Sequence, residues 1–138
     1  CLFLTGNVYS AQYEVKMLSS GKGGSMVFEP SVINIQPGDS VKWLNASPSH
    51  NAASINEMMP SGAKAWNGKM NEEIVVEFTE EGVYGYKCTP HYILGMVGLV
   101  IVGNPESNLD KSKDFAEQAQ SKFAMNKSRF SEYFSLIK

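Results

Sequence analysis

The stretch Val83-Tyr-Gly-Tyr-Lys-Cys88-Thr-Pro-His91-Tyr-Ile-Leu-Gly-Met96-Val97-Gly-Leu-Val-Ile-Val102 decides the fold of this chain. Residues 83–88 and 97–102 are short runs rich in Val, Ile, Leu and Tyr, which is typical of β-strands. The loop between these two runs is short and contains Pro and Gly, which mark turns. We therefore expect two neighbouring strands joined by a compact loop.

Upstream of this pair the sequence continues as short strands separated by turns. Further strands are predicted at residues 13–18, 26–28, 31–35, 40–44 and 73–78. Pro30, Pro37-Gly38-Asp39 and Glu81-Gly82 mark turns between them. Seven or so short strands with frequent turns predict a β-sandwich. Residues 45–71 form one long irregular connection, and a connection of this length in a small domain is usually functional.

The composition changes after Gly103. Phe115, Ala119 and Phe123 recur at four-residue steps, and a second apolar series runs from Phe130 to Ile137. These spacings are helical, so one or two amphipathic α-helices are predicted, with their aromatic side chains facing the core. The fold class is therefore mainly β, with a sandwich over about residues 11–103 and C-terminal helices over about residues 104–138.

Size and composition limit the function. A chain of 138 residues fits one domain, and its net charge of −2 provides no basic surface for nucleic acid. Residues 1–10 carry no charge and resemble the end of an export signal cleaved after Ser10. An ordinary N-terminal arm, or a lipid anchor at Cys1, is the alternative. No later segment has the 18 apolar residues that span a membrane, so no membrane insertion is expected.

Cys88, His91 and Met96 provide a thiol, an imidazole and a thioether within nine residues. The chain contains two histidines, and the other, His50, lies in the long irregular connection. Two His and one Cys in a plane with a weak axial Met describe a blue-copper electron-transfer site. The donor chemistry therefore favours copper held by His50, Cys88, His91 and Met96.

Other interpretations of these residues remain open on this reasoning alone. A zinc site is possible, although structural zinc prefers four nitrogen or sulfur ligands and thioether is a poor ligand for it. A Cys–His nucleophile pair is conceivable, but nothing identifies a substrate pocket. A disulfide between Cys1 and Cys88 would require Cys1 to survive processing. Taken singly, each of these residues could also be an ordinary core or surface residue.

The sequence Cys88-Thr-Pro-His91-Tyr92, followed by Gly95-Met96, closely resembles the ligand loop of the pseudoazurins, a family of the cupredoxins. The resemblance covers essentially residues 11–138 and has a highly specific ligand motif. Further matching segments are Met26-Val-Phe-Glu-Pro30, Pro37-Gly38-Asp39, Ser49-His50-Asn51, Met59-Pro60 with Gly62-Ala63, and the C-terminal helices.

This resemblance implies an eight-stranded Greek-key sandwich with one type 1 copper ion at one end. His50 and His91 would bind through ring nitrogen, Cys88 through thiolate and Met96 axially. Asn51 would tie the two ligand loops together, with its backbone N–H donating to the Cys88 sulfur. Met26 would lie near the ring of His91.

The resemblance also implies a soluble, monomeric, periplasmic electron carrier that is not an enzyme. Its partner would be a copper nitrite reductase or a related nitrogen-oxide reductase of denitrification, or alternatively a cytochrome. His91 would be the electron port, and Pro90, Ile93 and Leu94 would form part of the docking patch. The alternative functions are a copper-dependent oxidase domain, which would need further histidines, and a copper-binding module without a carrier role.

Pseudoazurins often surround the copper end with lysines, and this chain departs from that pattern. Lys22, Lys64, Lys69 and Lys87 are candidates for such a ring, whereas Ser20, Pro48 and Asn67 are uncharged. We therefore expect weaker electrostatic steering toward an acidic partner.

Overall fold

The computed structural model of the protein describes residues 10–137. The predicted export-signal remnant therefore lies, apart from Ser10, outside the described residues. The strands are β1 (Gln12–Gly21), β2 (Gly24–Glu29), β3 (Val32–Ile35), β4 (Ser40–Leu44), β5 (Ala53–Ser54), β6 (Ile74–Glu77), β7 (Gly82–Lys87) and β8 (Val97–Val102). The helices are α1 (Leu109–Gln120), α2 (Arg129–Phe134) and three short 3-10 turns, η1 (Asn56–Met58), η2 (Tyr92–Leu94) and η3 (Pro105–Ser107).

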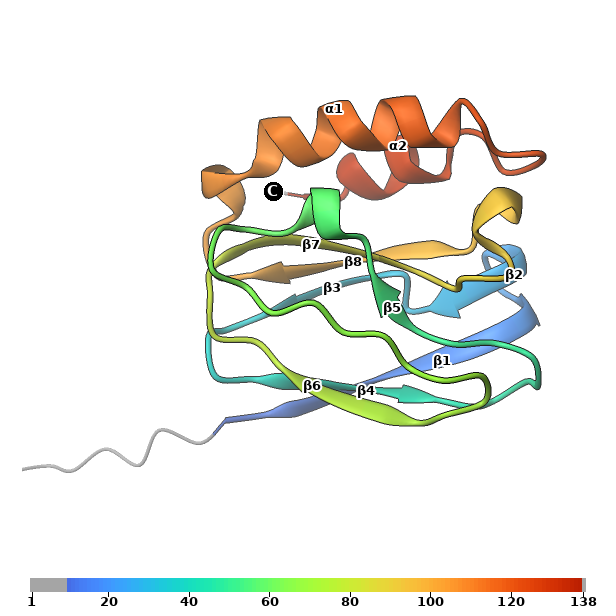
Figure 1. Ribbon diagram of the computed structural model, residues 1–138, viewed down its shortest axis with the longest axis horizontal. Coiled ribbons are helices and arrows are strands. Elements are labelled where there is room, and N and C mark those ends of the chain that lie inside the picture. The colour runs from blue at the N-terminus through green and yellow to red at the C-terminus, as the bar shows by residue number, and fades with distance from the viewer. Residues whose placement is uncertain (1–9, 138) are drawn as a thin grey trace, which may run out of the picture.

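The eight strands form two four-stranded sheets that face each other (Figure 1). The strand orders are β2-β1-β4-β6 and β3-β8-β7-β5. β1 pairs in parallel with β4, and β3 pairs in parallel with β8, whereas the other ladders are antiparallel. The predicted mainly β sandwich with C-terminal helices is therefore confirmed.

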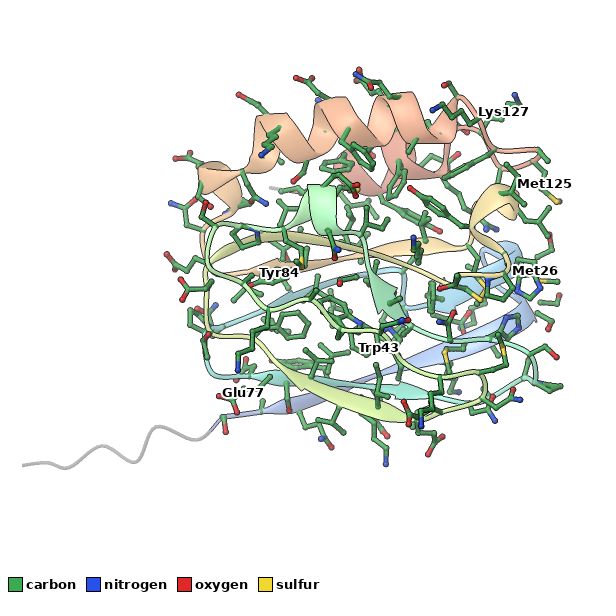
Figure 2. All side chains as sticks on the ribbon, in the orientation of Figure 1. Met26, Trp43, Glu77, Tyr84, Met125 and Lys127 are labelled. Atoms are coloured by element: carbon green, nitrogen blue, oxygen red, sulfur yellow. The ribbon has the colours of Figure 1, made fainter. Side chains whose placement is uncertain are left out.

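The unbroken apolar sequence of β8 is explained by burial on both of its faces. Val100 and Val102 belong to the core between the two sheets, which also contains Trp43 (Figure 2). Leu99 and Ile101 face the opposite way and belong to a second core beneath the helices. Side chains alternate between the two faces of a strand, so a strand covered on both faces is apolar throughout.

The helices cover one sheet, the one that contains β7 and β8 (Figure 1). Within residues 10–137, no helix has both the length and the apolar character needed to cross a bilayer.

Several segments that are distant in sequence meet at one end of the sandwich. The β1–β2 hairpin, the η2 turn between β7 and β8, and the link between α1 and α2 all lie at the right of Figure 1. Met26, Met125 and Lys127 mark this end in Figure 2, and Glu77 and Tyr84 lie toward the other end. The candidate ligands from the loop between β7 and β8 therefore lie at one end of the molecule.

Candidate metal centre

The loop between β7 and β8 brings three of the candidate ligands together by folding back on itself. Cys88 directly follows β7 and Met96 directly precedes β8. The Cys88 N–H donates to the Met96 carbonyl at 3.0 Å, and the Met96 N–H donates to the His91 carbonyl at 3.2 Å. The His91 N–H donates to the Cys88 carbonyl at 3.2 Å. The backbone thus positions all three residues before any metal ligation is considered.

Gly95 allows this loop to close. It has a φ of 79°, in the left-handed region that glycine adopts without steric cost. A Cβ at Gly95 would lie 2.8 Å from the Cβ of Asn126, which belongs to the link between α1 and α2. A larger residue would therefore disturb both the loop and its contact with the helical layer.

His50 reaches the same place from the long connection that follows β4. The Asn71 N–H donates to the His50 carbonyl at 2.8 Å, and the Ser49 N–H donates to the Asn71 side-chain oxygen at 2.6 Å. The Ser19 hydroxyl lies 2.9 Å from His50 Nε2. This contact fixes the orientation of the ring and leaves Nδ1 facing inward. No motif in the sequence singled out Ser19 for this role.

The inward-facing donor atoms of three residues converge. His50 Nδ1 lies 3.1 Å from His91 Nδ1, and Cys88 Sγ lies 3.7 Å and 3.4 Å from the same two nitrogens. With metal–nitrogen and metal–sulfur bonds of about 2.0 and 2.3 Å, as for zinc, three ligands in a trigonal plane lie roughly 3.5–3.7 Å apart. His50, Cys88 and His91 therefore fit a common metal ion.

Met96 lies beside this group in the core. Its side chain is fully buried and belongs to the same apolar cluster as Cys88. A thioether in this position suits copper and is a poor ligand for zinc. The structure thus places all four predicted residues at one end of the sandwich, although the approach of the Met96 sulfur to the metal stays a prediction.

Burial changes the pKa values of two donor side chains, His50 and Cys88. Burial lowers the pKa of His50, and the neighbouring His91 lowers it further, so the neutral, ligating imidazole is favoured. Burial raises the pKa of the Cys88 thiol, while the backbone N–H groups of Asn51 and His91 act in the opposite direction. Because a metal binds the thiolate, binding at this site releases the Cys88 proton.

Asn51 connects the two ligand-bearing loops, as predicted. Its side-chain oxygen accepts from the Thr89 N–H at 2.6 Å. Its amide donates to the Thr89 hydroxyl at 3.1 Å and to the Gly68 carbonyl at 3.0 Å. The backbone N–H of Asn51 lowers the pKa of the Cys88 thiol, against the effect of burial. Such bonds around the ligands hold their orientation and tune the metal.

Comparisons with known proteins agree with this geometry. Residues 15–103 match the model of the copper-binding proteins of the plastocyanin/azurin family. The chain is 50% identical to a pseudoazurin from Methylorubrum extorquens over 72% of this chain and 67% of that protein. It is 44% identical to a pseudoazurin from Paracoccus pantotrophus over 81% and 77% of the respective chains. The chain belongs to the pseudoazurins.

Solved structures give the same result for the fold. The crystal structure of pseudoazurin from Methylobacterium extorquens AM1 superposes with a TM-score of 0.81 and 41% sequence identity. The match covers 92% of this chain and 99% of that one. Copper is therefore the cofactor, and membership of the pseudoazurins makes this chain a copper electron carrier and not an enzyme.

The surface around His91 is partly as predicted for a pseudoazurin docking patch. His91 itself is partly exposed, Pro90 is exposed and Ile93 is 53% exposed, whereas Leu94 is half-buried. Met26 is half-buried against the core that contains Cys88 and Met96. Its approach to the His91 ring stays a prediction.

The four candidate lysines are distributed unevenly. Lys22 lies in the β1–β2 hairpin, Lys69 follows Gly68, and Lys87 places its ammonium 4.9 Å from the centre of the Tyr92 ring. Lys64 instead lines a hollow together with Glu77 and Tyr84, which lie toward the other end of the sandwich (Figure 2). Three of the four candidates therefore lie near the metal end, where Lys122 and Lys127 of the link between α1 and α2 also lie.

Proposed function

We propose that His50, Cys88, His91 and Met96 bind one copper ion, and that the protein carries single electrons in the periplasm. The observation that carries this proposal is the convergence of two imidazole nitrogens and one thiol sulfur, 3.1–3.7 Å apart, beside a buried methionine. We further propose a copper nitrite reductase, or a related nitrogen-oxide reductase, as the electron acceptor. A cytochrome is the alternative partner.

Bound copper would supply one-electron chemistry between its cupric and cuprous states. The protein's contribution is a donor set that moves little. Ser19 holds the ring of His50, and Asn51 ties the two ligand loops together. The loop hydrogen bonds fix His91 and Met96 to the ends of two buried strands. A donor set held in this way needs little rearrangement when an electron arrives, which favours fast transfer.

His91 provides the route by which an electron would pass between the metal and the surface. Its side chain is partly exposed, whereas His50 and Cys88 are fully buried. The exposed apolar side chains of Pro90 and Ile93 flank it. A small apolar patch of this kind suits a redox encounter, in which the partners must dissociate quickly. The uncharged, initially apolar residues 1–10 support export to the periplasm.

Copper titration tests the metal part of the proposal. We expect one equivalent of copper(II) to give an intense visible thiolate-to-copper absorption, because a buried thiolate is one of the ligands. Cys88→Ser should abolish this absorption. A protein that binds zinc tightly and remains colourless after copper addition would disprove the proposal.

The axial position has its own test. Met96→Leu should retain copper and shift the reduction potential, because the axial ligand tunes the potential of such a site. Met70→Leu is the matched control, since Met70 is an exposed residue outside the donor set. If the Met96 variant has the spectrum and potential of the unmodified protein, Met96 is not a ligand.

A further inference from the structure

The link between the two C-terminal helices, together with the first residue of α2, holds three consecutive carbonyls of the metal-ligand loop. The Ala124 N–H donates to the Ile93 carbonyl at 2.7 Å, and the Asn126 side-chain amide donates to the Leu94 carbonyl at 2.9 Å. Arg129 Nη1 then donates to the Gly95 carbonyl at 3.0 Å. We call residues 124–129 the clamp segment. These three bonds reach three of the four residues that separate His91 from Met96.

Arg129 also binds the hairpin between β1 and β2. Its Nη1 donates to the Met26 carbonyl at 2.6 Å, and its Nη2 donates to the carbonyls of Ser25 at 2.7 Å and Gly23 at 3.4 Å. Gly24 has a φ of 113°, and a Cβ there would lie 3.3 Å from Nη2. The hairpin therefore wraps closely around the guanidinium. One side chain joins the C-terminal helix, the hairpin and the ligand loop.

The Arg129 guanidinium is a buried charge that is bound by neutral groups. Arg129 is 4% exposed, and each hydrogen-bond partner of its guanidinium within residues 10–137 is a neutral backbone carbonyl. Arginine is not deprotonated in proteins, so the positive charge remains there. A buried charge is screened by salt much less than a charge on the surface. The ligand loop thus lies against a permanent positive charge.

We propose that Arg129 is a positioning residue for the ligand loop and that its buried charge raises the reduction potential of the centre; the second part rests on the proposed copper-carrier function. The positioning follows from the bond to the Gly95 carbonyl, because Gly95 directly precedes the axial Met96. The sign of the electrostatic effect follows from Coulomb's law: the oxidised centre carries one more positive charge than the reduced centre, so a nearby cation destabilises the oxidised form.

Mutation can separate the two properties of Arg129, its forked set of N–H donors and its positive charge. Arginine presents five N–H donors in a planar fork, which allows one side chain to bind four carbonyls on two segments. Lysine keeps the charge but has a single ammonium and cannot bridge the same set. Arg129→Lys therefore tests the fork, and Arg129→Gln removes the charge while keeping a polar side chain.

The reduction potential tests the charge. We expect Arg129→Gln to change the ratio of copper(II) to copper(I) affinity by about tenfold, which corresponds to a potential lower by about 59 mV. Arg129→Lys should change the potential less. Lys127→Gln is the matched control, because it removes the same charge from an exposed side chain of the clamp segment (Figure 2). The Arg129→Gln shift should persist at high salt, since the charge is buried.

Hydrogen exchange in the full-length, metal-free protein tests the positioning. Both Arg129 variants should speed amide exchange at Gly95 and Met96, whereas Lys127→Gln should not. This measurement needs no copper, and it can be made on Arg129→Lys if the glutamine variant does not fold. Because it is independent of metal, it also separates a failure of this inference from a failure of the proposed function.

Two results would overturn the inference. If Arg129→Gln has the potential of the Lys127→Gln control, or loses its shift at high salt, the buried charge does not set the potential. If amide exchange in the ligand loop is the same in both Arg129 variants and in the unmodified protein, Arg129 does not position the loop.

Discussion

Asp39 is a carboxylate whose hydrogen bonds come from the backbone of two separate segments. Its Oδ1 accepts from the Ala11 N–H at 2.8 Å, and its Oδ2 accepts from the Gln36 N–H at 2.9 Å. The side chain thus joins the start of β1 to the turn before β4. The Ala11 and Gln36 N–H groups, in that order of effect, lower the pKa of Asp39 below its usual value of 3.8, while burial opposes them.

This lowered pKa predicts a contribution to acid sensitivity. The ionised carboxylate stabilises the folded state at pH values above 3.8, and the contribution is lost as the pH falls through the lower, folded-state pKa. Asp39→Ala should therefore reduce stability at neutral pH and flatten the loss of stability in acid. Urea unfolding midpoints measured from neutral to acidic pH would show this. Asp114→Ala, at an exposed position of α1, should keep the steep acid dependence.

At the scale of elements, the helical layer depends on a small group of aromatic side chains. Phe130 in α2 is fully buried, and its ring centre lies 5.9 Å from that of Phe123 and 6.4 Å from that of Phe134. These rings pack on Leu99 and Ile101 of β8 in the second core. The layer therefore attaches to the sheet that carries the ligand loop through its side-chain packing.

Truncation of Phe130 tests this attachment. Phe130→Ala should lower the free energy of unfolding by about 3–5 kcal/mol, because it removes a buried ring and leaves a cavity. Leu136→Ala is the control from the same C-terminal region, since Leu136 is 59% exposed, and should change it by less than about 0.5 kcal/mol. A loss in Phe130→Ala as small as that of the control would show that the ring is not needed for the attachment. Chemical denaturation of both variants gives the comparison.

Sequence patterns predicted the helices and strands whose signals lie in neighbouring residues. Each of the seven predicted strands overlaps a strand of the structure, because apolar composition and turn residues act over neighbouring positions. β5 was not predicted, since it has two residues and exists through pairing with Tyr86 and Lys87 of β7. The spacing of Phe115, Ala119 and Phe123 predicted a helix that reaches Phe123. In the structure α1 ends at Gln120, and Phe123 packs into the second core from the turn that follows.

In the candidate site, too, the sequence identified residues that are close together in the chain and missed those that only folding brings together. Cys88, His91 and Met96 share one loop, so their spacing in the sequence was informative. Ser19 and Arg129 were not identified, because Ser19 meets His50 across 31 positions and Arg129 meets Met26 across 103 positions. Neither residue belongs to a motif, and only the folded chain brings them to the ligands.

At the scale of the whole molecule, the charges suit a weakly steered carrier. The net charge is −2, and the lysines near the metal end include Lys22, Lys69 and Lys87, together with Lys122 and Lys127 of the link between α1 and α2. Lys87 is half-buried against Tyr92, and the other four are exposed. Long-range attraction to an acidic partner depends on such charges and is reduced by salt. The apolar patch around His91 should then contribute most of the contact energy at docking.

This charge distribution predicts a shallow salt dependence of electron transfer. With a copper nitrite reductase as acceptor, we expect the second-order rate constant to fall less than about tenfold as ionic strength rises from about 0.01 M to 0.1 M, where the Debye length shrinks from about 30 Å to 10 Å. Stopped-flow oxidation of the reduced protein measures this rate. The variant Lys22→Gln/Lys69→Gln should reduce the remaining dependence, because it removes two of the exposed positive charges beside the site. Lys64→Gln/Lys111→Gln changes the net charge equally, but both residues lie away from the ligand loop. If the two double variants slow the reaction equally, net charge and not the metal end steers the encounter.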